Sequence, residues 1–157
     1  MLLFLFRFDE DRFAVAADRV EAVLPLVEIG RAAGLPAGVA GVINWRGAPV
    51  PVVDLVAVLA GRPAQAAMST RLLVCPLPLA GGRCVPLALM VENATGLVRR
   101  PRTDFVASGI RADGTPYLGP VAPDAEGVVQ LVDPVLLLPQ AVLATLYDGL
   151  AVAGAAS

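Results

Sequence analysis

Short runs of alternating apolar and polar residues dominate the first part of the chain. Residues 2–8 alternate and are rich in Leu and Phe, a polar run follows at 9–11, and residues 12–16 alternate again. Because successive side chains of a strand point to opposite faces, this period of two predicts β-strands. We therefore expect a β-hairpin at the start, followed over 17–25 by either a short helical turn or a bent strand.

The strongest strand pattern covers residues 39–58, with a tight turn at Arg46-Gly47. Pro49 and Pro51 cannot donate hydrogen bonds to a neighbouring strand, so we expect an edge or a kink at these positions. Residues 30–38, just before this region, hold three glycines and one proline and therefore predict a loop.

The second half of the chain shows a similar order of patterns. A hairpin is expected over 71–77 and 84–91, with Gly81-Gly82 at its turn. Residues 117–137 again alternate as strands, and residues 138–150 predict a terminal helix.

An internal repeat relates the two halves. Residues 13–24 (FAVAADRVEAVL) resemble residues 87–98 (LALMVENATGLV) in the spacing of apolar and acidic positions, although any two hairpins of an apolar β-protein share part of this pattern. A repeat of this kind is typical of two small closed barrels, because closure removes exposed strand edges. We predict one domain over 1–157, with subdomains at about 13–66 and 71–137 and with termini 1–12 and 138–157 that pack across them or are flexible.

Composition narrows the function classes. Hydrophobic residues make up 57% of the chain and charged residues 17%, a balance that predicts a folded protein. The net charge is −2, which does not favour nucleic-acid binding, since such binding needs a basic surface, so we expect no nucleic-acid partner. The apolar start lacks a basic region and a small-residue cleavage site, and Pro139, Gln140 and Asp148 interrupt the apolar end. We therefore expect a cytoplasmic protein without direct membrane insertion.

Most catalytic chemistry is missing from the sequence. There is no His and no Lys, and none of the three serines lies in a Gly-x-Ser-x-Gly motif. Cys75 and Cys84 without a histidine are too few for a zinc site, so we expect no metal and no cofactor. Asp54 and Asp133 each follow an apolar strand; they could form a catalytic carboxylate pair, or each could cap the following turn through its N–H groups. We expect no enzyme activity, and a small-ligand-binding β-barrel stays open as an alternative.

One segment carries a family resemblance. Residues 41–55 read GVINWRGAPVPVVDL and resemble the signature of CheW-type adaptors, a Gly-Val-Ile-Asn-Leu-Arg-Gly run followed by a Val/Pro-rich strand and Asp-Leu. Residues 20–24, 89–92 and 129–133 agree with the same family. Trp45 departs from the family pattern, which has Leu or Ile, and Pro120 stands where Val is usual.

The resemblance implies an all-β fold of two SH3-like five-stranded barrels. It also implies a non-catalytic adaptor that joins the cytoplasmic tip of a chemoreceptor to a CheA-type histidine kinase, at the kinase's own CheW-like regulatory domain. Residues 117–121 (YLGPV) and the opening residues 1–11 resemble the Wsp surface-sensing branch, which controls cyclic-di-GMP. Flagellar and pilus-type pathways remain alternatives.

Candidate contact residues cluster around the turn at Arg46. A turn exposes its side chains, and Arg and Trp are enriched among binding hot spots; alternatively, Arg46 pairs with a carboxylate of the fold and Trp45 fills a gap in the core. The resemblance ties the matching Arg to partner binding. Val23, Leu24, Val42 and Ile43 are expected to line an apolar groove for a receptor helix tip, or to lie in the core. The candidate partner-binding residues are therefore Arg46, Trp45, Asn44, Gly47, Val42 and Val23.

Overall fold

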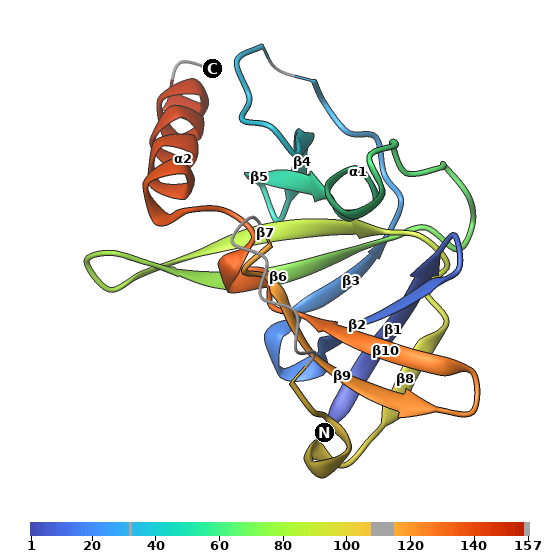
Figure 1. The fold of residues 1–157 in the computed structure, drawn as a ribbon. Helices are drawn as coiled ribbons and strands as arrows, with labels where there is room; N and C mark the ends of the chain where they lie inside the picture. The colour runs from blue at the N-terminus through green and yellow to red at the C-terminus, as the bar shows by residue number, and fades with distance from the viewer. Residues whose placement is uncertain (32, 108–114, 156–157) are drawn as a thin grey trace.

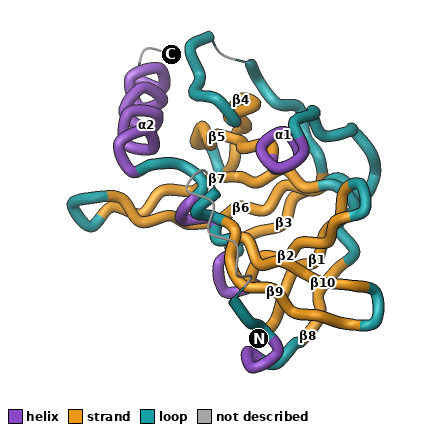
Figure 2. The backbone as a smooth tube through the Cα atoms, in the orientation of Figure 1, coloured by secondary structure: helices purple, strands orange, loops and turns teal. Residues whose placement is uncertain are grey.

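The computed structural model describes residues 1–31, 33–107 and 115–155, the last five as backbone, and consists mainly of strands (Figure 2). Two five-stranded sheets make up the body of the molecule (Figure 1). Sheet A has the order β8-β1-β2-β10-β9, with bounds Gly96–Arg99, Leu2–Phe8, Asp11–Ala16, Gly127–Val132 and Leu118–Asp124. Sheet B has the order β3-β6-β7-β5-β4, with bounds Ala22–Pro25, Arg71–Leu79, Arg83–Val91, Ala48–Asp54 and Val39–Trp45.

The two sheets follow one plan. Each contains an antiparallel hairpin, β1–β2 in sheet A and β6–β7 in sheet B. In sheet A, β2 pairs in parallel with β10, and β10 pairs antiparallel with β9. In sheet B, β7 pairs in parallel with β5, and β5 pairs antiparallel with β4. The internal repeat expected from the sequence is therefore present as a repeat of strand order.

The third strand of each repeat crosses to the other sheet. β3 follows β2 in the chain but pairs with β6 of sheet B, and β8 follows β7 but pairs with β1 of sheet A. The sheets therefore do not coincide with the segments 13–66 and 71–137, and residues 2–8 form an interior strand of sheet A instead of a terminus packed across the barrels. The alternation of a strand shows which of its faces is apolar but carries no information about the neighbour it pairs with.

Single bridges close each sheet into a small barrel. Gly30, beyond β3, and Val42 of β4 exchange two backbone hydrogen bonds of 2.8 Å, which joins the two edges of sheet B. Val106 and Val121 do the same in sheet A, at 2.8 and 2.9 Å. Gly41 makes the first closure possible, since a Cβ there would lie 2.3 Å from the carbonyl oxygen of Gly30.

Three apolar clusters form the core. One fills the interior of sheet B and includes Ile43 and Val50, and a smaller one inside sheet A includes Leu3 and Val129. The largest cluster lies between the barrels and contains the stacked rings of Phe6, Phe8 and Phe13, whose centroids are 4.9 to 6.3 Å apart. Because sheet A and sheet B both contribute to this cluster, the two barrels form one packed body.

The helices lie at the ends of strands. The strand pattern expected over 39–58 ends at Asp54, and Leu55–Ala60 instead forms α1, which Gly61 terminates at φ +73°. The expected terminal helix is α2, Gln140–Ala155, which follows a 3₁₀ turn at Pro134–Leu136 and stands above the long β6–β7 hairpin (Figure 1). Within the described part of the chain, no helix combines the length and apolarity needed to cross a membrane.

Candidate docking surface

The β4–β5 hairpin ends in a two-residue turn. Trp45 pairs with Ala48, and the residues between them, Arg46 and Gly47, have φ angles of +53° and +78°. Two positive φ angles are typical of the hairpin turn whose twist matches the strands. Glycine adopts this region freely, whereas a residue with a side chain pays roughly 1–2 kcal/mol, so Arg46 is held there by the turn. Asn44 helps, since its Oδ1 accepts a 3.0 Å hydrogen bond from the Gly47 N–H.

Arg46 projects from this turn with its side chain 67% exposed. Its guanidinium carbon lies 4.3 Å from the centroid of the Trp45 ring, and its Nη1 lies 3.4 Å from Oε1 of Glu21. Cation–π contacts and ion pairs at exposed sites each contribute only about 0.2–1 kcal/mol. The guanidinium is thus oriented by two weak contacts and remains open to a partner.

Trp45 is half-buried. Its side chain packs against the apolar interior of sheet B, while its ring also supports Arg46. The structural alternative left open by the sequence therefore applies in part: Arg46 does pair with a carboxylate of the fold, Glu21, and Trp45 does cover the core. Glu21 was not identified from the sequence as the partner of Arg46, because the two residues are 25 positions apart in the chain.

A narrow apolar groove runs between the two barrels. Val23 of β3 lines it, and the other lining residues come from four further strands and the β7–β8 connection: Phe4, Leu5, Phe6, Arg71, Leu73, Val91, Ala94 and Gly96. Its cavity volume is about 130 Å³. Val23 is 42% exposed there, so its methyl groups are accessible from outside the protein.

The other residues expected to line this groove lie elsewhere. Ile43 is buried inside sheet B, and Leu24 packs against the same cluster. Val42 forms the closing bridge with Gly30 at the far edge of sheet B. The groove residues contributed by β1 were missed, because the sequence shows that residues 2–8 form an apolar strand but not that this strand lines a groove together with Val23 of sheet B.

Asp54 and Asp133 are structural caps. Asp54 accepts hydrogen bonds from the N–H groups of Ala57 and Ala64, at 3.1 and 2.9 Å, and Asp133 accepts one from Val135 at 3.0 Å. Both carboxylates therefore stabilise the chain segments that follow their strands. This outcome favours the capping interpretation of the two residues over the catalytic pair.

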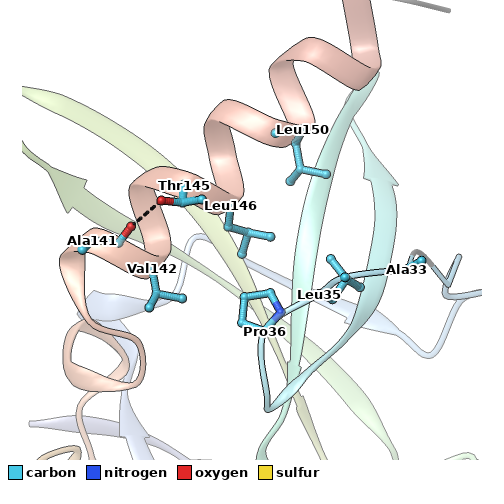
Figure 3. Close-up of a pocket in the computed structure, with 10 residues that line it drawn as sticks. Ala33, Leu35, Pro36, Ala141, Val142, Thr145, Leu146 and Leu150 are labelled. Atoms are coloured by element: carbon cyan, nitrogen blue, oxygen red, sulfur yellow. Dashed lines mark hydrogen bonds between the residues drawn. The ribbon is translucent and has the colours of Figure 1, made fainter.

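An apolar cavity lies between α2 and the β3–β4 loop (Figure 3). It has a volume of about 620 Å³, and apolar side chains such as Leu35, Pro36, Val142 and Leu146 face it. The hydroxyl of Thr145 in its wall already donates to the carbonyl of Ala141 at 2.9 Å. Among the described residues, no group of three Cys, Asp or Glu side chains is placed to hold a metal ion.

Comparisons with known proteins agree with this architecture. The family model described as "CheW-like domain" matches residues 2–142. No curated protein matches the chain. Among solved structures, the crystal structure of the scaffolding protein TtCheW from Thermoanaerobacter tengcongensis superposes with a TM-score of 0.73 and 15% sequence identity, over 88% of this chain and 89% of that one, which shows a shared fold. Since the family match extends from β1 into α2, the chain belongs to the family of CheW-like domains.

Proposed function

We propose that this protein is a non-catalytic adaptor that couples a chemoreceptor to a CheA-type histidine kinase. The observation that carries the proposal is the exposed turn at Arg46, which lies within the segment 41–55 that resembles the family signature. The turn presents an exposed cation beside an aromatic ring, and Arg and Trp are both enriched among binding hot spots. The adaptor would act in the cytoplasm, against membrane-bound receptor arrays.

The inter-barrel groove is the proposed receptor site. Its lining is apolar apart from Arg71, and it lies between strands of both barrels, which suits the apolar face of a helix tip. Glu21 and Val23 sit two residues apart, so one short segment carries both the ion-pair partner of Arg46 and a wall of the groove. The two proposed partner sites are therefore neighbours on the surface.

A Wsp-type surface-sensing pathway is the proposed output. It is supported by the sequence at 117–121 and by the opening residues 1–11. Neighbouring genes test this assignment: a diguanylate cyclase response regulator beside the coding gene supports it, whereas flagellar or pilus genes contradict it.

The adaptor proposal is tested by reversing the charge of Arg46. The variant Arg46→Asp should lose binding to the kinase regulatory domain, to the receptor cytoplasmic fragment, or to both, in titration calorimetry, while circular dichroism shows an intact fold. Arg83→Asp is the matched control, since Arg83 also lies at a hairpin end, is 51% exposed and is 3.6 Å from Asp148. Binding of both partners by Arg46→Asp at unchanged affinity would contradict the proposal.

A further inference from the structure

The position of the Arg46 guanidinium beside the Trp45 ring suggests that these two residues of the hairpin have different roles in docking. We infer that Trp45 is a positioning residue, which holds Arg46 so that the open N–H edge of its guanidinium receives a carboxylate of the partner protein. The inference rests on the proposed docking function, which it deepens in two ways. It assigns the two neighbouring residues different roles, and it names the chemistry of the group they recognise.

Trp45 is a fixed platform. It lies on β4 and pairs with Ala48 across the hairpin, and its side chain packs against the interior of sheet B. The adjoining turn is also fixed, by the hydrogen bond from Gly47 to Asn44. If the ring turned away it would lose its packing against the interior of sheet B, so we infer that the contact at 4.3 Å restrains the exposed Arg46 side chain more than Trp45.

The contact with Trp45 leaves hydrogen-bond donors of Arg46 free. A guanidinium is planar and carries five N–H donors that point outward in its plane, so an aromatic ring against its face uses none of them. One terminal nitrogen, Nη1, meets Glu21 at 3.4 Å, and the other donors have no hydrogen-bond partner in the described parts of the chain. Since the side chain is 67% exposed, these donors face solvent.

Glu21 shows which chemistry fits the site. It already brings one carboxylate oxygen to Arg46, but at a long distance and with its own side chain 42% exposed. An Arg fork binds a carboxylate most strongly through two parallel hydrogen bonds, which this contact does not make. A carboxylate of the partner can therefore make the bidentate pair that Glu21 leaves unmade, either beside Glu21 or in its place.

A double-mutant cycle tests the positioning role. The full chain and its variants Trp45→Leu, Arg46→Ala and the double variant are titrated with the kinase regulatory domain and, separately, with the receptor cytoplasmic fragment. Loss of a cation–π contact corresponds to about two- to fivefold weaker binding. We expect this loss for Trp45→Leu when Arg46 is present. In the Arg46→Ala background, Trp45→Leu should cause no further loss. Equal losses in both backgrounds would show that Trp45 touches the partner directly and would overturn the inference.

A second readout needs no partner. Trp45 is the single tryptophan of the chain, so its fluorescence reports on its own surroundings. The Trp45 emission should shift in Arg46→Ala and stay unchanged in Arg83→Ala. In nuclear magnetic resonance, the Arg46 Nε–H should show lower order in Trp45→Leu, and Trp45→Phe should restore part of that order. If neither the Trp45 emission nor the order of the Arg46 Nε–H changed, the inference would be overturned. If both changed as expected but Arg46→Ala bound its partners normally, the docking proposal would fail instead.

The salt dependence of binding tests whether the partner group is a carboxylate. Binding of the wild type should weaken as NaCl rises from low to high concentration, and Arg46→Gln should show a shallower dependence because one screened charge pair is gone. Arg46→Lys should recover the salt dependence but not the full affinity, since an ammonium neither stacks flat nor makes the fork. Equal salt dependence in the wild type and Arg46→Gln would exclude an acidic partner group.

Discussion

Arg62 donates hydrogen bonds to both carboxylate oxygens of Glu92, at 2.8 and 2.9 Å. It also donates to Asp9 at 3.1 Å, and Glu92 accepts a further bond of 2.7 Å from the N–H of Gln65. Asp9 lies in the β1–β2 turn of sheet A, and Glu92 directly follows β7 of sheet B. One arginine therefore ties the two barrels together at their polar rim.

Removing the charge of Glu92 should destabilise the fold. Glu92→Gln presents an amide N–H₂ either to Arg62 or to the N–H of Gln65, and both are donors. Because Glu92 is only 5% exposed, we expect a loss on the order of 1–3 kcal/mol in the free energy of unfolding, measured by urea denaturation. Glu10→Gln, on the exposed β1–β2 turn, is the control and should leave the stability unchanged.

The same carboxylate should make the protein acid-sensitive. The Arg62 guanidinium, helped by the N–H of Gln65, lowers the pKa of Glu92 in the folded state. Its contribution to stability is thus fully present above the ordinary Glu pKa of about 4.3 and is lost as the pH falls through the lower folded value. Urea midpoints measured between pH 7 and pH 3 should drop more in the wild type than in Glu92→Gln; parallel curves would contradict this assignment.

Barrel closure depends on the absence of a side chain at Gly41. In Gly41→Ala, the new Cβ would lie 2.3 Å from the Gly30 carbonyl oxygen and 2.6 Å from Cγ2 of Ile29, and the backbone atom cannot move away without opening the bridge to Val42. We expect a loss of about 1–3 kcal/mol in stability and faster hydrogen exchange at the Val42 N–H.

Gly149→Ala provides the control for this substitution. Gly149 lies in α2 with open space around its Cα, so alanine should fit there and favour the helix by about 0.8–1 kcal/mol. In thermal unfolding, Gly41→Ala should lower the stability and Gly149→Ala should raise it. This result would confirm that the close contact at Gly41, and not a general effect of alanine, opens the barrel.

The groove can be tested with two valines of equal exposure. Val23 lines the groove, whereas Val27 lies beyond β3 and outside its lining, and their exposed fractions are 42% and 41%. Val23→Asp places a charge on apolar surface that must be desolvated on binding, so the receptor fragment should bind on the order of tenfold more weakly or worse. Val27→Asp should bind as the wild type does; equal losses in both variants would remove the groove from the proposed receptor site.

The two thiols should react at very different rates. Cys84 is exposed on β7, whereas Cys75 is buried on β6, and burial raises the pKa of Cys75 to about 12. Because the thiolate is the reactive form, a thiol reagent at pH 8 should modify Cys84 alone in the native protein and both residues in denaturant. Rapid modification of Cys75 under native conditions would contradict its placement between the sheets.

Much of the docking turn was predictable because its geometry is local. The Arg46-Gly47 turn, the positive φ at Gly47 and the caps at Asp54 and Asp133 involve residues at most a few positions apart, apart from the second bond of Asp54 to Ala64. Glu21, in contrast, meets Arg46 only because β3 joins the barrel of the β4–β5 hairpin. Whether these residues bind partners stays a prediction that the proposed variants test.

Periodicity, proline, glycine and capping residues act over short distances, so the amino-acid sequence was sufficient to locate most strands and turns and to show the family resemblance. Long-range packing was needed to show that β3 and β8 exchange barrels and that Gly30 and Val106 close them. The same holds for Val23, which lines a groove, and Ile43, which lies in a core. An alternating strand specifies the polarity of its two faces, whereas the strands it pairs with are chosen by the packing of the whole chain.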